Sequence, residues 1–157
     1  MRAPASSLLL VLCFLPSPVH ADQTATHSVQ ARAQFQSRTS LSVSSSILHF
    51  SHADPQSPTV VTVDFTARAR TAVAGEVVLT VEVLRTIEGP GGSADVEVDL
   101  AFTGEGEGTR GGSMSGLPVT AGRWTGSGVH SGRLSFALRT AIPGDYQVPL
   151  RFVLTAP

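Results

Sequence analysis

The chain has 157 residues, of which 41% are hydrophobic, 6% aromatic and 15% charged, and its formal net charge is -1. The charges are scattered and aromatic residues are few, which argues against a nucleic-acid-binding protein with a basic stripe and stacking platforms. All 11 basic residues are arginine and asparagine is absent, a bias typical of a GC-rich bacterial coding sequence.

Residues 1–21 have the features of a secretory signal peptide. Arg2 supplies the positive charge, a leucine-rich apolar run follows it, and Val19 to Ala21 form a small-residue cleavage site. The apolar run is far shorter than the roughly 20 residues that a membrane-spanning helix needs. Cleavage would make Asp22 the first mature residue and would remove Cys13, the only cysteine. We therefore expect an exported domain with no disulfide bond and no membrane span.

Residues 22–36 form an N-terminal segment that contains the first predicted strand. Hydrophobic and polar side chains alternate between residues 26 and 35, which places one set on a single face of an extended chain. That face carries Val29, Ala31, Ala33 and Phe35. A strand so close to the mature N-terminus can pair within its own domain or with a neighbouring molecule, and the sequence leaves both arrangements open.

The same alternation predicts a series of strands over residues 37–102. They lie at 41–43, 47–50, 59–70, 76–87 and 96–102, and clusters of Pro, Gly, Ser and Asp separate several of them. Val78 and Leu84 make the strand at 76–87 partly apolar on both faces. This pattern is typical of a strand in the middle of a sheet.

Residues 104–132 differ from the rest because they are rich in glycine. The stretch from Gly104 to Gly128 holds nine of the 15 glycines, which predicts a long loop with at most one short strand, at 117–124. One interpretation is a mobile connection. The other is a ligand-binding loop in which Arg123 and Trp124 contact the ligand.

The last quarter of the chain predicts two strands joined by a tight turn. Leu134, Phe136 and Leu138 alternate with polar residues, and so do the hydrophobic residues between Tyr146 and Leu154. No mature segment shows sustained helical periodicity. Short alternating strands between turn signals predict an all-β fold, an antiparallel immunoglobulin-like β-sandwich of about seven strands over residues 37–157.

Residues with catalytic or metal-binding chemistry form no recognisable motif. His49 and His52 are three positions apart, so they should point to opposite faces of an extended chain and chelate a metal poorly. The GEGEG sequence at 104–108 lacks the ligand ladder of a calcium loop, and no serine lies in a G-x-S-x-G context. We therefore predict no enzyme activity, no cofactor and no metal site.

Two stretches resemble a known family. Pro143-Gly144-Asp145-Tyr146, followed by an alternating strand, is similar to the C-terminal ending of spore coat U-like and other chaperone–usher pilin subunits. Leu48-His49-Phe50 and Val61 to Phe65 resemble two earlier strands of these proteins. The likeness covers most of the mature chain in layout but depends on few residues. Those pilins commonly carry a disulfide bond, for which residues 22–157 have no cysteines.

The resemblance implies a structural rather than a catalytic role. Tyr146 would be a corner tyrosine, and the strand after it would lack the final sandwich strand beside it. Pilins fill that place with a strand donated by a periplasmic chaperone and then by the next subunit. The implied function is a fimbrial or adhesive subunit at the bacterial surface, with 26–35 as its donor strand and a chaperone, an usher and like subunits as partners. The alternative is a self-contained periplasmic or secreted sandwich that binds a protein or a small ligand.

Overall fold

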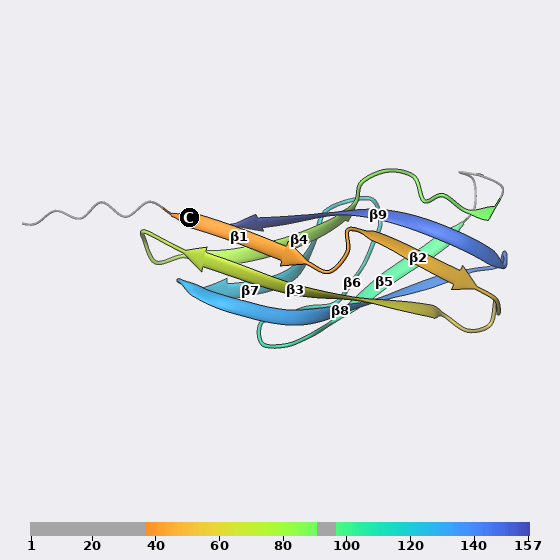
Figure 1. The fold of residues 1–157 in the computed structure, drawn as a ribbon, viewed down its shortest axis with the longest axis horizontal. Coiled ribbons are helices and arrows are strands. Elements are labelled where there is room, and N and C mark those ends of the chain that lie inside the picture. Colours follow the sequence, from red (N-terminus) through yellow and green to blue (C-terminus); the bar gives the residue numbers. More distant parts are fainter. Residues whose placement is uncertain (1–36, 91–96) are drawn as a thin grey trace, which may run out of the picture. The chain divides into compact units, whose positions relative to one another are not determined.

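The computed structural model describes residues 37–90 and 97–157, so the predicted signal peptide and the strand predicted at 26–35 lie outside the described residues. The described residues form nine strands and no α-helix (Figure 1). The strands are β1 (Arg38–Val43), β2 (Ile47–His52), β3 (Thr59–Arg70), β4 (Glu76–Val83), β5 (Val98–Glu105), β6 (Gly112–Ser113), β7 (Val119–Thr125), β8 (Gly128–Thr140) and β9 (Gly144–Thr155).

The nine strands form two sheets, in which every pair of neighbouring strands is antiparallel. The first sheet has the order β1-β3-β8-β5-β6 and the second the order β2-β9-β4-β7. The prediction of an all-β, antiparallel fold is confirmed. β4 lies between β9 and β7, as the apolar residues on both of its faces predicted.

A single apolar core lies between the sheets, because each strand turns one of its two faces inward. Leu134, Phe136 and Leu138 of β8 are fully buried, as their alternation predicted. The Phe136 ring lies 5.5 Å from the ring of Phe102 on β5. Phe65 of the first sheet lies 6.0 Å from Trp124 of the second, so aromatic contacts also join the two layers. Each such buried side chain stabilises the fold by roughly 1.5–3 kcal/mol.

β1 and β2 are two halves of one extended segment that changes sheets between residues 44 and 46. Ser44 donates its N–H to the Asp64 carbonyl and accepts a hydrogen bond from the Asp64 N–H on its hydroxyl. The Ser46 carbonyl accepts from the N–H of Leu150 in the other sheet. Because these groups satisfy the backbone at the crossing, β1 can pair with β3 while β2 pairs with β9.

Residues 104–132 do not form the long loop that their glycines predicted, although the short strand expected at 117–124 is present as β7. They contain the end of β5, all of β6 and β7, and the start of β8. Glycine is used here for close packing: a Cβ atom on Gly122 would lie 2.3 Å from the Trp124 ring. Glycine is normally unfavourable in strands, but at this position the absence of a side chain allows the Trp124 ring to pack closely.

We expect Phe136→Ala to lower the free energy of unfolding by about 3–5 kcal/mol, because Phe136 is fully buried and its loss leaves a cavity between the sheets. Chemical denaturation would measure the change. Val60→Ala is the control: Val60 is 55% exposed on a neighbouring strand and its truncation should alter stability by less than about 0.5 kcal/mol. Equal effects of the two substitutions would contradict the inward face assigned to β8.

Candidate functional site

The connection between β8 and β9 is held by Tyr146, the residue that the resemblance marks as a corner tyrosine. Its side chain is buried, and its hydroxyl donates a hydrogen bond of 2.6 Å to the main-chain carbonyl of Ile142. The Thr140 hydroxyl lies 3.4 Å from the same phenolic oxygen. The tyrosine therefore fixes the turn through which the chain passes from the first sheet to the second, as a tyrosine corner does.

A buried histidine supports the same end of the sandwich. His52 Nε2 lies 3.1 Å from the Thr140 carbonyl, and Nδ1 lies 2.9 Å from the Thr59 hydroxyl. Because a carbonyl can only accept, Nε2 is the donor in the first contact. His49 is exposed, so the prediction that His49 and His52 point to opposite faces is confirmed. Sequence reasoning did not find the structural role of His52, whose partners come from two other segments.

The edge of β9 next to β2 is paired over only half of the strand. β2 pairs with residues 144–149, and the N–H of Leu150 reaches Ser46. Beyond this point the described part of the chain has no strand on that side of β9, while β4 pairs with residues 150–155 on the other side. The N–H and C=O groups of successive residues point alternately to the two sides of a strand. Those of Phe152 and Leu154 therefore point to the same side as those of Leu150.

The side chains along this half edge are apolar and incompletely covered. Phe152 and Leu154 of β9 are half-buried, and so are Leu41 and Val43 of β1 in the other sheet. Near the end of this edge, the Ser37 hydroxyl donates a 2.6 Å hydrogen bond to the Pro157 carbonyl. We call residues 151–155 of β9, together with β1, the half-open edge. The predicted donor face (Val29, Ala31, Ala33 and Phe35) lies outside the described residues.

The resemblance implies that the strand after Tyr146 lacks the final sandwich strand beside it; in the structure this strand, β9, pairs with β2 over residues 144–149 and with β4 over residues 150–155. β9 is an inner strand of its sheet, because β2 lies on one side of it and β4 on the other. The reason is the crossing at residues 44–46, which brings an N-terminal segment into the second sheet. Sequence periodicity predicts the strand at 47–50 but gives no information on which sheet it joins.

Trp124 lies in a strand rather than in a loop. It is in β7, is 6% exposed, and donates its indole N–H to the Glu107 carbonyl at 2.7 Å. The ring of His130 stacks on it at 4.7 Å between centroids. Arg123 is on the opposite, exposed face of β7 and forms an ion pair with Glu76 at 2.8 Å. The structure therefore separates the two residues that were predicted to contact one ligand.

Within 37–90 and 97–157, no group of three or more His, Cys, Asp or Glu side chains could hold a metal ion. The buried Nε2 atom of His130 has no hydrogen-bond partner, but its neighbour is the Trp124 ring rather than a second polar group. The contacts around Tyr146, His52 and Trp124 support the fold.

No helix in the described part of the chain is long and apolar enough to cross a membrane. Comparisons with models of known protein families, with curated proteins and with solved structures found no match to this chain.

Tyr146→Phe should destabilise the protein by about 1–3 kcal/mol, because the Ile142 carbonyl would lose its donor at a partly buried position. Thermal and chemical denaturation would measure the loss. Ser131→Ala is a suitable comparison, since it removes an exposed hydroxyl whose contact with Thr66 water can replace. If both variants were as stable as the parent, the corner hydrogen bond would contribute nothing to the fold.

Gly108→Ala should destabilise the protein more than Gly116→Ala. Both glycines have positive φ angles, 73° and 81°, so each alanine is strained by about 1–2 kcal/mol. Only at Gly108 would the new Cβ also lie 2.6 Å from the indole nitrogen of Trp124; at Gly116 nothing lies within 4 Å. Denaturation followed by the fluorescence of the single tryptophan would measure both effects. Equal losses would mean that the 104–108 segment does not pack on Trp124.

Proposed function

We propose that the two sheets have an immunoglobulin-like arrangement. An immunoglobulin sandwich pairs strands A, B, E and D in one sheet and C, F and G in the other. In chain order β1, β3, β4, β5, β8 and β9 correspond to A through F, since the first sheet begins β1-β3-β8-β5 and β9 lies beside β4. β2 then occupies part of the position of strand G beside β9. β6 and β7 are additional strands between strands D and E, which are β5 and β8.

We infer that the protein is an exported structural subunit, pilin-like, that assembles with copies of itself by strand donation into a surface fibre or coat. Its role would be mechanical or adhesive, at the cell surface, in the periplasm or outside the cell. It would need no cofactor. A periplasmic chaperone and an usher would be its partners before assembly.

The half-open edge is the single observation that carries this proposal. The main-chain groups of Phe152 and Leu154 face away from β4, and the apolar side chains between β1 and β9 are half-buried. An added strand would pair with those groups and cover those side chains, which is how extended peptides bind to sheet edges. An apolar edge of this kind otherwise promotes unspecific aggregation.

The donor in this proposal is residues 26–35, whose hydrophobic face carries Val29, Ala31, Ala33 and Phe35. β2 already pairs with the first half of β9, so the donated strand would cover residues 151–155 rather than the whole of β9. Five residues match about half of the donor segment. The rest of the donor would therefore extend beyond the edge or would displace β2.

A second candidate, a self-contained binding module, is favoured by one specific observation. β2 comes from the same chain and pairs with residues 144–149, so the second sheet is partly completed without a partner. In this alternative, residues 26–35 pair with the half-open edge of their own molecule. The protein would then be a stable monomer that binds a protein or a small ligand.

Introduced cysteines can distinguish these functions, because residues 22–157 contain no cysteine of their own. Val153 points outward from the half-open edge and is 41% exposed. We would combine Val153→Cys with Gln30→Cys, Arg32→Cys or Gln34→Cys on the polar face of the donor, and oxidise each variant of the exported chain. Donation between copies should give a ladder of disulfide-linked oligomers on a non-reducing gel, which collapses with reductant.

The control pairs Gln34→Cys with Thr62→Cys, an exposed position on the outer face of β3 in the other sheet. It should stay monomeric under the same oxidation. A disulfide within single molecules would support the self-contained module instead of the pilin-like subunit. If none of the three pairs formed a disulfide faster than the control, both versions of the edge pairing would be wrong.

A further inference from the structure

The space between β1 and the second half of β9 is bounded at both of its ends by hydrogen bonds. At the inner end, the N–H of Leu150 donates a bond of 2.8 Å to the Ser46 carbonyl. At the outer end, the Ser37 hydroxyl donates a bond of 2.6 Å to the Pro157 carbonyl. Ser37 directly precedes β1 and Pro157 follows β9, so this second bond joins the two sheets. The half-open edge is therefore limited in length from both sides.

The hydroxyl of Ser37 connects three segments of the chain. It accepts a hydrogen bond of 3.2 Å from the N–H of Ala72, which lies in the turn between β3 and β4. The ring of Pro157 packs on the same turn, since a Cβ atom on Gly75 would lie 2.4 Å from its Cγ atom. The start of β1, the β3–β4 turn and the residues after β9 therefore meet at one hydroxyl. We call the hydrogen bonds of Ser37 to Ala72 and Pro157 the Ser37 contact.

The half-open edge is shorter than the donor segment. Within the described part of the chain, the side of β9 away from β4 has no paired strand over residues 151–155. Five residues of strand span roughly 17 Å, whereas the ten residues 26–35 span roughly 33 Å. A strand can therefore pair along the whole edge and continue past it only if one of the two ends opens.

The two ends differ in how firmly they are held. At the inner end, residues 44–46 connect β1 to β2, and Ser44 forms two hydrogen bonds with Asp64 of β3. All of β2 then pairs with β9. The outer end depends on Ser37 and Pro157, which are both exposed. Water can replace an exposed hydroxyl as a partner, so this bond contributes little net stability. The outer end is therefore the one that opens more easily.

We propose that the Ser37 contact is a latch on the half-open edge. While it is formed, the start of β1 and the end of β9 are held together, and an incoming strand can pair with Phe152 and Leu154 only after the contact breaks. This inference rests on the proposed strand donation and names the residue that regulates it. Ser37 is a positioning residue, because it acts through the carbonyl of Pro157.

The exported chain, residues 22–157, and a fluorescent synthetic peptide of residues 26–35 test the latch. Ser37→Ala removes the hydroxyl and should take up the peptide roughly two- to tenfold faster than the parent, as expected from the loss of one hydrogen bond. Ser37→Thr keeps a hydroxyl and should stay close to the parent rate. Fluorescence anisotropy after rapid mixing would measure uptake.

Gly75→Ala reaches the same contact by a different route. The new Cβ atom would push the Pro157 ring away from the β3–β4 turn, and with it the carbonyl to which Ser37 donates. The hydroxyl of Ser37 is unchanged in this variant. Uptake of the peptide should nevertheless be faster than in the parent, because the latch is weakened from the side of Pro157.

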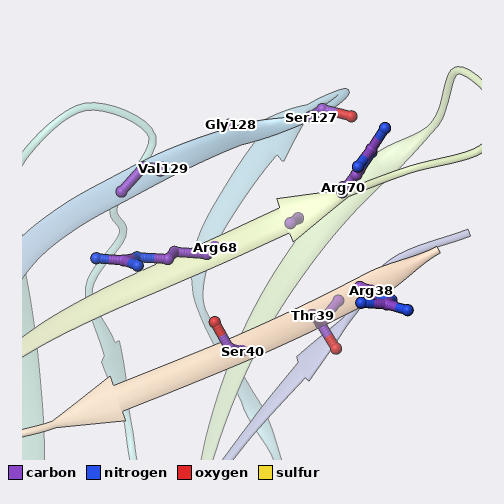
Figure 2. A pocket seen from close by; sticks show the side chains of 9 residues that line it. Arg38, Thr39, Ser40, Arg68, Arg70, Ser127, Gly128 and Val129 are labelled. Atoms are coloured by element: carbon purple, nitrogen blue, oxygen red, sulfur yellow. The ribbon is translucent and has the colours of Figure 1, made fainter.

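Ser127→Ala is the matched control. The Ser127 hydroxyl accepts a hydrogen bond of 2.9 Å from the N–H of Thr71 and lies 3.2 Å from the Thr71 hydroxyl, so it also holds the β3–β4 turn. In Figure 2, Ser127 and Arg38 lie on opposite sides of the end of β3, because β3 is between β8 and β1. Ser127→Ala should therefore leave the uptake rate unchanged. Circular dichroism would confirm that each variant is folded.

The rates decide the inference. One common rate for the parent, Ser37→Ala and Gly75→Ala would overturn the latch. A Ser127→Ala variant as fast as Ser37→Ala would also overturn it, since the effect would then belong to the turn alone.

The disulfide ladder at Val153 remains the separate readout of strand donation between copies. A ladder together with a common uptake rate would leave the pilin-like function in place and remove only the latch. Faster uptake by Ser37→Ala without a ladder would support the latch and remove assembly into a fibre. If there were no ladder and no variant took up the peptide, both proposals would be wrong.

Discussion

The structure depends first on the apolar side chains that two sheets bury between them. The described residues contain no cysteine, so no covalent link assists this contact. The exposed ion pairs Glu76–Arg123 and Asp64–Arg133 contribute little because water screens them. Alternation along each strand therefore has to be accurate, since a shift of one residue would turn a hydrophobic face to solvent.

The two connections between the sheets determine which part of β9 has no second neighbouring strand in the described residues. The Tyr146 corner delivers β9 to the middle of the second sheet, and the serines at 44–46 carry the N-terminal segment from the first sheet to the same strand. Because β1 and β2 are the two halves of one extended segment, each pairs with only part of the strand next to it. β1 is the edge strand of the first sheet and β2 that of the second, so within residues 37–90 and 97–157 the second half of β9 has no strand on the side away from β4. The proposed assembly surface follows directly from this division.

Glycine and histidine illustrate how far local rules reach. Gly108 and Gly122 are next to Trp124, where a Cβ atom would collide with the indole, so they serve packing. His52 looks like an ordinary strand-end histidine in the sequence, yet it links the Thr59 hydroxyl to the Thr140 carbonyl. Neither role has a local signature, because each partner comes from a distant part of the chain.

The sequence by itself determined the strand class of the fold, the inward faces of β3, β8 and β9, and the turn before Tyr146. These features depend on a period of two and on turn residues, which act over a few positions. Only the tertiary structure decided that β2 joins the second sheet, that the glycine-rich residues form strands, and that Trp124 and Arg123 lie on opposite faces of β7. Those outcomes depend on which distant strands pair and pack, and alternation is the same for a strand in either sheet.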